Sequence, residues 1–216
     1  MGMVADTVIY LSGVAPPLFL QERRPDIGIM LNVRSGTARH HLANGPWAVE
    51  NGGYESATFD PEPWLRHLAS LTPYLSTCLF AIAPDVLHDA DATRARSLPV
   101  IPRLQALGFP VAYVAQPGCI REHVPWSEIG CLFLGGDRRW QSTPEVYRLV
   151  DQAKEKGLWV HKGQVNSWKH LRSCSGSGMD SADGTRLRFS PVAAHRDLKR
   201  WMDRLRCQTR LMEGIG

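Results

Sequence analysis

Short runs of apolar and β-branched residues recur along the chain, and each run ends at glycine, proline or polar residues. A continuous apolar run of this length is typical of a strand that is covered on both faces. The last run leads into Gly178–Thr185, where two aspartates stand three residues apart among glycines. The pattern predicts eight strands, at residues 7–11, 27–33, 47–50, 78–83, 111–115, 131–134, 158–160 and around Met179.

The segments between these runs carry apolar residues at helical spacing. Ser142–Glu145 has the pattern of a capping box with a proline in the first turn, which predicts a helix that starts there and ends at Gly157. In residues 90–108, two prolines are expected to break the helical segment into pieces. Further helices are predicted at residues 61–75 and 193–212, the second with arginines opposite its apolar stripe.

Strands that alternate with helices imply right-handed βαβ units and a parallel sheet. Eight such units predict a compact (β/α)8 TIM-like barrel, an α/β fold in which residues 1–216 form a single catalytic domain. An open doubly wound sheet is the alternative. The sequence contains neither GxGxxG after the first strand nor GxxxxGK followed by Ser or Thr, which disfavours that alternative.

The composition is that of a globular protein, with 44% hydrophobic and 21% charged residues. No apolar run approaches the ~18 residues that span a bilayer, and the N-terminus lacks the pattern of a signal peptide, so we expect a cytoplasmic protein. The five cysteines stand singly without a CxxC pair, and His40, His41 and His88 lack metal-ligand spacing. Neither a disulfide framework nor a metal site is therefore expected.

Basic residues gather toward the C-terminus, although the net charge is only +4. From residue 161 onward the chain has eleven Lys or Arg against five Asp or Glu. A basic face of this kind suits a polyanionic partner such as nucleic acid. A solvated helix face accounts for the same pattern, and the charge alone leaves both interpretations open.

In a (β/α)8 barrel the active site lies at the carboxyl ends of the strands. Polar residues or glycines follow most of the predicted strands here, so we expect them to converge on one mouth. They are Glu50, Asp85, Gln116, Gly135, Gly136, His161, Lys162 and Asp183.

Five strand-end segments resemble, in the same order, the motifs of one enzyme family. They are Glu50–Tyr54, Asp85 with Ala92–Arg94, Gln116–Gly118, Leu134–Gly136 and Gly178–Asp183, and the loop Lys162–Ser167 is also similar. The family is that of the transglycosylases that exchange guanine for a 7-deazaguanine base in tRNA or DNA. The resemblance implies a nucleic-acid guanine transglycosylase that needs no cofactor.

Two departures from the tRNA enzymes bear on the substrate. The first acid is Glu50 where those enzymes usually have Asp, and their C-terminal CxCxxC…H zinc module is missing. That module supports tRNA docking and dimerisation in the family. The resemblance therefore implies the compact, often phage-encoded branch that modifies DNA, with DNA and a preQ0-like base as partners and the host cytoplasm as its location.

The resemblance also implies roles for single residues. Asp183 would be the nucleophile that forms a covalent glycosyl-aspartate, and Glu50 the general acid/base. Guanine offers N1–H and an exocyclic amine, which a carboxylate accepts in one plane, and the base must leave a duplex to reach the pocket. Base-binding residues are implied at Asp85, Gln116, Gly135, Gly136 and Tyr54. Phosphate contacts are implied at Lys162, Arg138, Arg139, Arg186 and Arg188. Supporting roles fall to Asp180, Asn51 and His161.

Three other functions fit the sequence. One is a tRNA-guanine transglycosylase that recruits a partner subunit for docking. Another is a catalytically idle barrel of the same superfamily that binds nucleic acid. The last is a small-molecule glycosidase or aldolase-type barrel, which would not need the basic C-terminal part.

Overall fold

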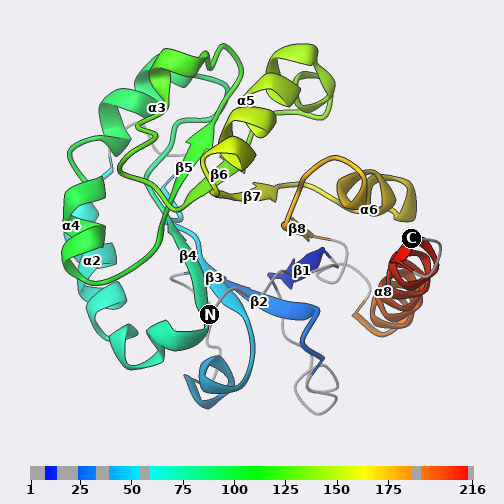
Figure 1. The fold of residues 1–216 in the computed structure, drawn as a ribbon. Helices are drawn as coiled ribbons and strands as arrows, with labels where there is room; N and C mark the ends of the chain where they lie inside the picture. Colours follow the sequence, from blue (N-terminus) through cyan, green and yellow to red (C-terminus); the bar gives the residue numbers. More distant parts are fainter. Residues whose placement is uncertain (1–7, 14–23, 33–38, 54–58, 186–190, 214–216) are drawn as a thin grey trace.

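The structure is a computed structural model that describes residues 8–13, 24–32, 39–53, 59–185 and 191–213. Eight parallel strands close into a barrel in which each strand pairs with its neighbours in the sequence, and β8 pairs with β1 (Figure 1). The closed barrel confirms the predicted (β/α)8 architecture and excludes the open sheet. The strands are β1 Ile9–Ser12, β2 Ile27–Leu31, β3 Trp47–Val49, β4 Cys78–Ile82, β5 Val111–Ala115, β6 Cys131–Leu134, β7 Trp159–Lys162 and β8 Ser181–Gly184.

The helices lie outside the barrel, and several connections are short. Between β5 and β6 the chain forms only the 3-10 turn η3, which helps to explain how a barrel fits into 216 residues. The α-helices are α2 Pro61–Ala69, α3 Ala90–Ser97, α4 Ile101–Ala106, α5 Pro144–Glu155, α6 Trp168–Ser175 and α8 Pro191–Glu213. The 3-10 segments are η1 Arg39–Asn44, η2 Thr72–Thr77, η3 Arg121–His123 and η4 Trp140–Ser142.

Pro99 lies between α3 and α4 and breaks the segment as predicted, whereas Pro102 lies in the first turn of α4, where a proline is tolerated. The predicted capping box is wrong in its chemistry. Thr143 is the N-cap of α5, but its side chain forms no capping hydrogen bond, and its buried hydroxyl has no partner among the described residues. Pro144 at the first position still starts the helix, since its missing N–H would be unpaired there in any case.

Six of the eight predicted strands differ from the observed ones in their limits, and three of these differences bear on the site. β2 ends at Leu31, so Asn32 follows the strand rather than lying inside it. β7 extends to Lys162, so His161 lies within the strand. β8 occupies Ser181–Gly184, whereas the strand was expected around Met179 with a loop after it.

The core has two layers. Inside the barrel, alternate residues of the strands form an apolar cluster below the mouth, made of Ile9, Leu11, Met30, Ala48, Phe80, Ile82, Ala112, Val114 and Cys131. The other side chains of the strands face outward and are covered by the helices. This alternation decides which strand residues can reach the mouth.

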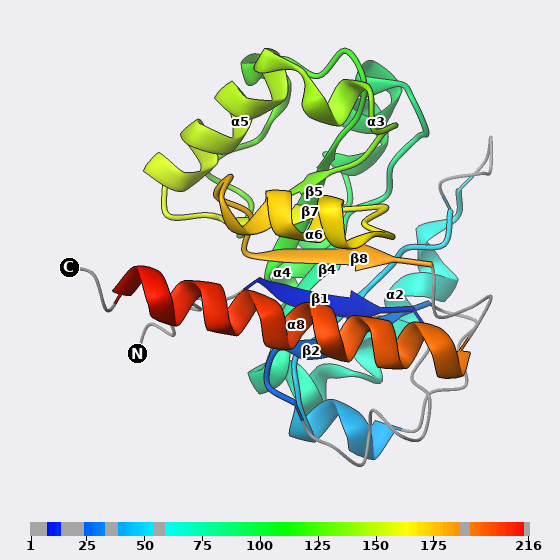
Figure 2. The same ribbon diagram turned by 90° about the vertical axis from the view of Figure 1, so that its right-hand side faces the viewer.

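The C-terminal helix α8 lies beside α6 and runs along the outer face of β1 and β8 (Figure 2). Its residues Ala194, Leu198, Met202 and Leu205 are buried at helical spacing against the barrel. Within the described residues, no helix is long and apolar enough to cross a membrane.

Candidate active site

A pocket of about 390 Å³ opens at the carboxyl ends of the strands. Most of the residues predicted from the strand ends line it together, although they come from positions that are far apart in the sequence. The predicted residues among its walls are Glu50, Asn51, Asp85, Gln116, Gly135, Gly136 and Asp183. Ile82, Val114 and Phe133 add apolar walls.

Glu50 follows β3 directly, and hydrogen bonds fix both its backbone and its side chain. Its backbone N–H donates to Leu31 O at 2.8 Å, and its backbone carbonyl accepts from Trp64 Nε1 at 3.2 Å. Its side-chain Oε2 accepts from Asn32 Nδ2 at 3.3 Å. Burial raises the pKa of Glu50 from 4.5 to about 7, and the negative charge of Asp183 adds to this shift. A carboxyl group with this pKa can both give and take a proton near neutral pH.

Asp85 lies in a buried amide network at the end of β4. Its two oxygens accept from Asn51 Nδ2 at 3.1 Å and from Gln116 Nε2 at 2.8 Å. Burial raises the pKa of Asp85, while these two hydrogen bonds oppose the shift. Gln116 is fixed in turn, because its Oε1 accepts from His88 N at 3.1 Å. The network places hydrogen-bond acceptors and donors in the wall of the pocket.

Gly135 and Gly136 form the pocket wall after β6 and leave no room for a side chain. A Cβ on Gly135 would lie 2.7 Å from Val114 Cγ1 and 2.9 Å from Gln116 Nε2. Gly136 has a φ of 68° and would bring a Cβ to 2.6 Å from the Pro117 ring. Both glycines line the pocket, and a side chain at either position would collide with its neighbours, while their predicted role in binding a base stays a prediction.

Asp183 is the third carboxylate of the pocket and projects inward from β8. Its Oδ1 accepts from the backbone N–H of Gln164 at 3.2 Å and contacts His161 Nε2 at 3.4 Å. Within the described part of the chain, Oδ2 accepts no hydrogen bond. One oxygen is thus fixed, while the other is available to a ligand.

A buried chain of polar groups supports Asp183 from below. Trp159 Nε1 donates to Ser181 Oγ at 2.7 Å, and Ser181 Oγ lies 2.8 Å from His161 Nδ1. Because the indole can only donate, the Ser181 hydroxyl has its own proton to give to Nδ1. The proton of a neutral imidazole then sits on Nε2 and faces Asp183. His161 is fully buried, with its ring centroid 4.5 Å from that of Phe133.

Gln164 is the strained residue of the site. Its φ of 64° is unusual for a residue with a side chain, and such strain persists only where the surroundings impose it. Its backbone N–H reaches Asp183, and its side-chain Nε2 donates to Gly136 O at 3.1 Å. The loop after β7 is thereby tied both to the carboxylate and to the glycine wall.

Some predicted residues lie elsewhere. Asp180, expected to support the site, precedes β8 at the opposite end of the barrel, where it pairs with Lys154 at 2.8 Å and accepts from Val160 N at 2.7 Å. Lys162 is next to the inward-facing His161 and so points outward. It lies near α6, where burial lowers the pKa of His170 and the positive charges of Arg138 and Lys162 add to that shift.

Arg138 and Arg139 are exposed on the turn after β6, at the same end of the barrel as the pocket. Neither of them lines the pocket. Tyr54, Arg186 and Arg188 lie outside the described residues, so their predicted roles stay predictions.

Sequence reasoning missed four residues that shape the pocket: Asn32, Gln141, Gln164 and Ser181. Asn32 directly follows β2. It would have been predicted to lie at the mouth of the barrel if the sequence had indicated that β2 ends at Leu31. Gln141 is buried and donates to the backbone carbonyls of Leu134, Gly135 and Gly163 at 3.1 to 3.3 Å. No local pattern marks it, because its partners come from two different strand ends.

Among the described residues, no group of three or more His, Cys, Asp or Glu is placed to hold a metal ion. The pocket does hold three carboxyl groups, those of Glu50, Asp85 and Asp183. Two of them, Glu50 and Asp183, interact electrostatically and differ in environment, which is the usual arrangement for dividing acid and nucleophile roles.

No protein-family model and no curated protein sequence matches the chain. Solved structures do resemble it. A mutant tryptophan synthase alpha-subunit from the hyperthermophile Pyrococcus furiosus has a TM-score of 0.59 at 14% identity, over 93% of this chain and 97% of that chain. L-Talarate dehydratase of Polaromonas sp. JS666 has a TM-score of 0.52 at 14% identity, over 85% of this chain and 55% of that chain, so this protein spans about half of it. At this identity the likeness shows the TIM-barrel fold alone.

Proposed function

We propose that this protein is a base-exchanging transglycosylase that replaces guanine in DNA by a 7-deazaguanine base. The observation that carries the proposal is the pairing of Glu50 and Asp183 in one pocket. Glu50 has a pKa of about 7, and Asp183 has one oxygen fixed and one free. An acid and a nucleophile on one pocket are what double displacement at a sugar carbon requires.

In the first step Asp183 Oδ2 attacks C1′ of the deoxyribose as the C1′–N9 bond breaks. The electron pair of that bond stays on the departing guanine, and protonated Glu50 gives the guanine a proton. The sugar is then held as an ester of Asp183. In the second step ionised Glu50 removes the proton of the incoming base, the base attacks C1′, and Asp183 leaves as a carboxylate.

The other pocket residues fit the recognition of a purine. Asp85 can accept from the N1–H and amino groups of guanine, and the remaining Gln116 N–H can reach an acceptor on the base. Gly135 and Gly136 allow the base to lie against the backbone, and Phe133 adds an aromatic wall.

The choice of DNA rests on the resemblance to the compact transglycosylases. An exchange assay tests it directly. The protein is incubated with a radiolabelled preQ0-type base or guanine, together with duplex DNA or unfractionated tRNA, and the label retained on polymer is counted. We expect label on DNA. Label on tRNA alone would assign the tRNA reaction instead, and label on neither polymer would contradict the transglycosylase proposal.

A further inference from the structure

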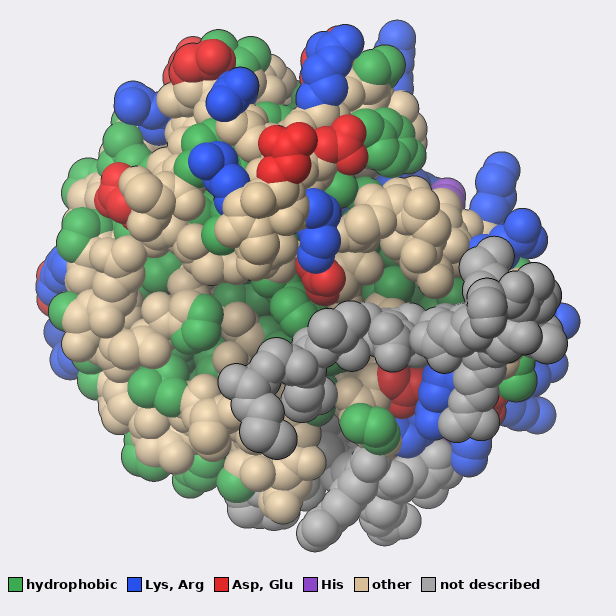
Figure 3. Space-filling model, viewed as in Figure 1, with side chains coloured by type: hydrophobic (Ala, Val, Ile, Leu, Met, Phe, Trp, Pro, Cys, Tyr) green, Lys and Arg blue, Asp and Glu red, His purple; other side chains and the backbone are tan. Residues whose placement is uncertain are grey.

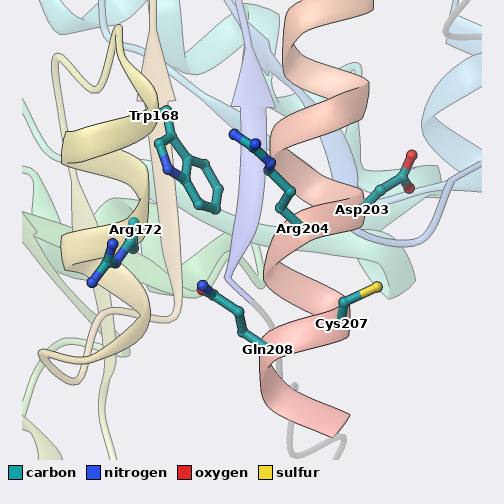
Figure 4. Close-up of a pocket in the computed structure, with 6 residues that line it drawn as sticks. All are labelled: Trp168, Arg172, Asp203, Arg204, Cys207 and Gln208. Carbon is teal, nitrogen blue, oxygen red and sulfur yellow. The ribbon is translucent and has the colours of Figure 1, made fainter. Parts of the chain in front are cut away.

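A second groove, separate from the base pocket, lies on the outside of the barrel between α6 and α8. It has a volume of about 500 Å³. Trp168 from α6 and Arg204 from α8 face each other across it, Gln208 from α8 points into it, and the Arg172 guanidinium points away from α8 (Figure 4). Trp168 lies at the end of the groove toward which β1 and β8 point, which is the end nearest the mouth (Figure 4).

The groove offers positive charge that the described protein does not neutralise. Arg172 and Arg204 form no ion pair with any described residue. The acid that lines the groove, Asp203, is already engaged by Arg24 at 2.8 Å and by Arg206 at 3.7 Å. The Arg204 guanidinium lies 5.5 Å from the centroid of the Trp168 ring. Arg204 and Trp168 thus form a cationic and aromatic platform beside the second guanidinium.

The groove is joined to the base pocket by one short segment. Gly163, Gln164 and Asn166 line the pocket, and Trp168 begins α6 and lines the groove. Ser167 between them is the N-cap of the helix. Lys and Arg side chains also gather along the side of the molecule where α6 and α8 lie (Figure 3). Residues 163–168, which join the pocket to the groove, include no Asp or Glu. A polymer with one nucleotide in the pocket can therefore extend along them into the groove.

We infer that the groove binds the phosphodiester backbone of the DNA that delivers its base to the pocket, an inference that rests on the proposed function. Arg204 and Arg172 bind separate phosphates along the backbone, because guanidinium groups bind phosphate oxygens through paired hydrogen bonds. The neighbouring sugar or an unpaired base lies against Trp168, since aromatic rings accept any base by stacking. The chemistry favours nucleic acid over a protein partner, because the described lining has two unpaired guanidiniums and no exposed aliphatic anchor.

The test compares two double variants that lose the same charge. Arg172→Ala with Arg204→Ala removes the groove cations, and Arg66→Ala with Arg148→Ala removes two exposed arginines from α2 and α5. Binding of a fluorescein-labelled DNA duplex is measured by anisotropy at several salt concentrations. We expect the groove variant to raise Kd about tenfold and to lower the salt slope by roughly one to two, while the control changes both far less. Trp168→Ala should weaken binding about fivefold, and Trp168→Phe should restore most of it.

Poly-glutamate serves as the competing probe. If the groove substitutions abolish binding of poly-glutamate while binding of DNA is unchanged, the groove binds acidic polypeptide and the inference is overturned. Equal DNA binding by the groove variant and its control would also overturn it. DNA binding is measured without base exchange. The groove inference and the proposed transglycosylase function can therefore each be rejected without the other. Loss of DNA binding in the groove variant together with no base exchange by the wild type would retain the groove and reject the transglycosylase.

Discussion

The burial of Glu50 favours its proposed role as an acid but lowers the stability of the folded protein. Its carboxyl group is buried beside Asp183, which raises its pKa to about 7 and makes it a useful acid. The same burial destabilises the folded protein whenever Glu50 is ionised. The folded state holds the proton more tightly than the unfolded state, so this cost grows as pH rises from about 4.5 to above 7.

Glu50→Gln should therefore stabilise the protein while it damages activity. At pH 8 the free energy of unfolding should rise by ~1–3 kcal/mol, because the amide carries no charge to desolvate. At pH 4.5 or below the two proteins should be nearly equally stable, since Glu50 is then protonated. Urea unfolding at the two pH values measures this difference. An equal effect at both values would contradict the raised pKa.

Ser181 is predicted to act through His161 rather than on the substrate. Ser181→Ala removes the donor that holds His161 Nδ1, so Nε2 no longer carries the proton toward Asp183 in every molecule. We expect kcat for base exchange to fall roughly 10- to 100-fold, with KM for DNA unchanged and a shifted pH profile. Ser173→Ala on the exposed face of α6 is the matched control. A parallel loss in both variants, or a change in KM alone, would argue against a positioning role.

At the scale of the elements, β5 and β6 were predicted with correct limits, and β8 was not. Proline or glycine precedes β5 and β6, and Gln116-Pro117 or Gly135-Gly136 follows them. β8 has the sequence Ser-Ala-Asp-Gly, which is typical of a turn. Its inward positions carry Ser181 and Asp183, so the polar residues of the candidate site conceal the strand.

The position of Gly184 gives a test of this element. A Cβ there would lie 2.4 Å from both Tyr10 Oη and Val165 O, because β8 passes close to β1 and to the loop after β7. Gly184→Ala should lower the free energy of unfolding by ~1–3 kcal/mol through overpacking. Gly176→Ala, where a Cβ would meet nothing within 4 Å, is the control. Thermal unfolding compares them, and equal melting temperatures would contradict this close packing of β8 against its neighbours.

The candidate site could be predicted only in part. Active sites of barrels lie at the carboxyl ends of the strands, and this rule located Glu50, Asp85, Gln116 and Asp183. To find each of these residues it is enough to predict where one strand ends. The rule could not separate Asp180 from Asp183, which lie three residues apart at opposite ends of one short strand. It also could not find Gln141, whose hydrogen bonds join strand ends that only the closed barrel brings together.

At the scale of the whole molecule, charged contacts tie α8 to the start of β2. Buried Asp26 pairs with Arg24 at 2.9 Å and with Arg206 of α8 at 3.1 Å. Arg24 also reaches Asp203 of α8 at 2.8 Å. Periodicity predicted the helix and the barrel, but this link could not be predicted, because its members are nearly 180 residues apart in the sequence.

Asp26→Ala should be strongly destabilising, since it leaves two guanidiniums without their buried carboxylate. We expect a loss of ~3–5 kcal/mol in the free energy of unfolding. Glu62→Ala breaks the exposed pair with Arg103 and should lower the free energy of unfolding far less, because solvent screens an exposed ion pair. Denaturant unfolding of both variants checks this. A loss of the same small size in each would show that α8 is not anchored in this way.

The central claim is that Asp183 becomes covalently bonded to the sugar, and trapping the intermediate tests it most directly. The protein is mixed with labelled duplex DNA in the absence of a 7-deazaguanine base, denatured and separated by gel electrophoresis. We predict a denaturation-resistant protein–DNA complex that disappears when a preQ0-type base is added and that never forms with Asp183→Asn. Base exchange by Asp183→Asn at the wild-type rate, or a complex that survives this substitution, would contradict the claim.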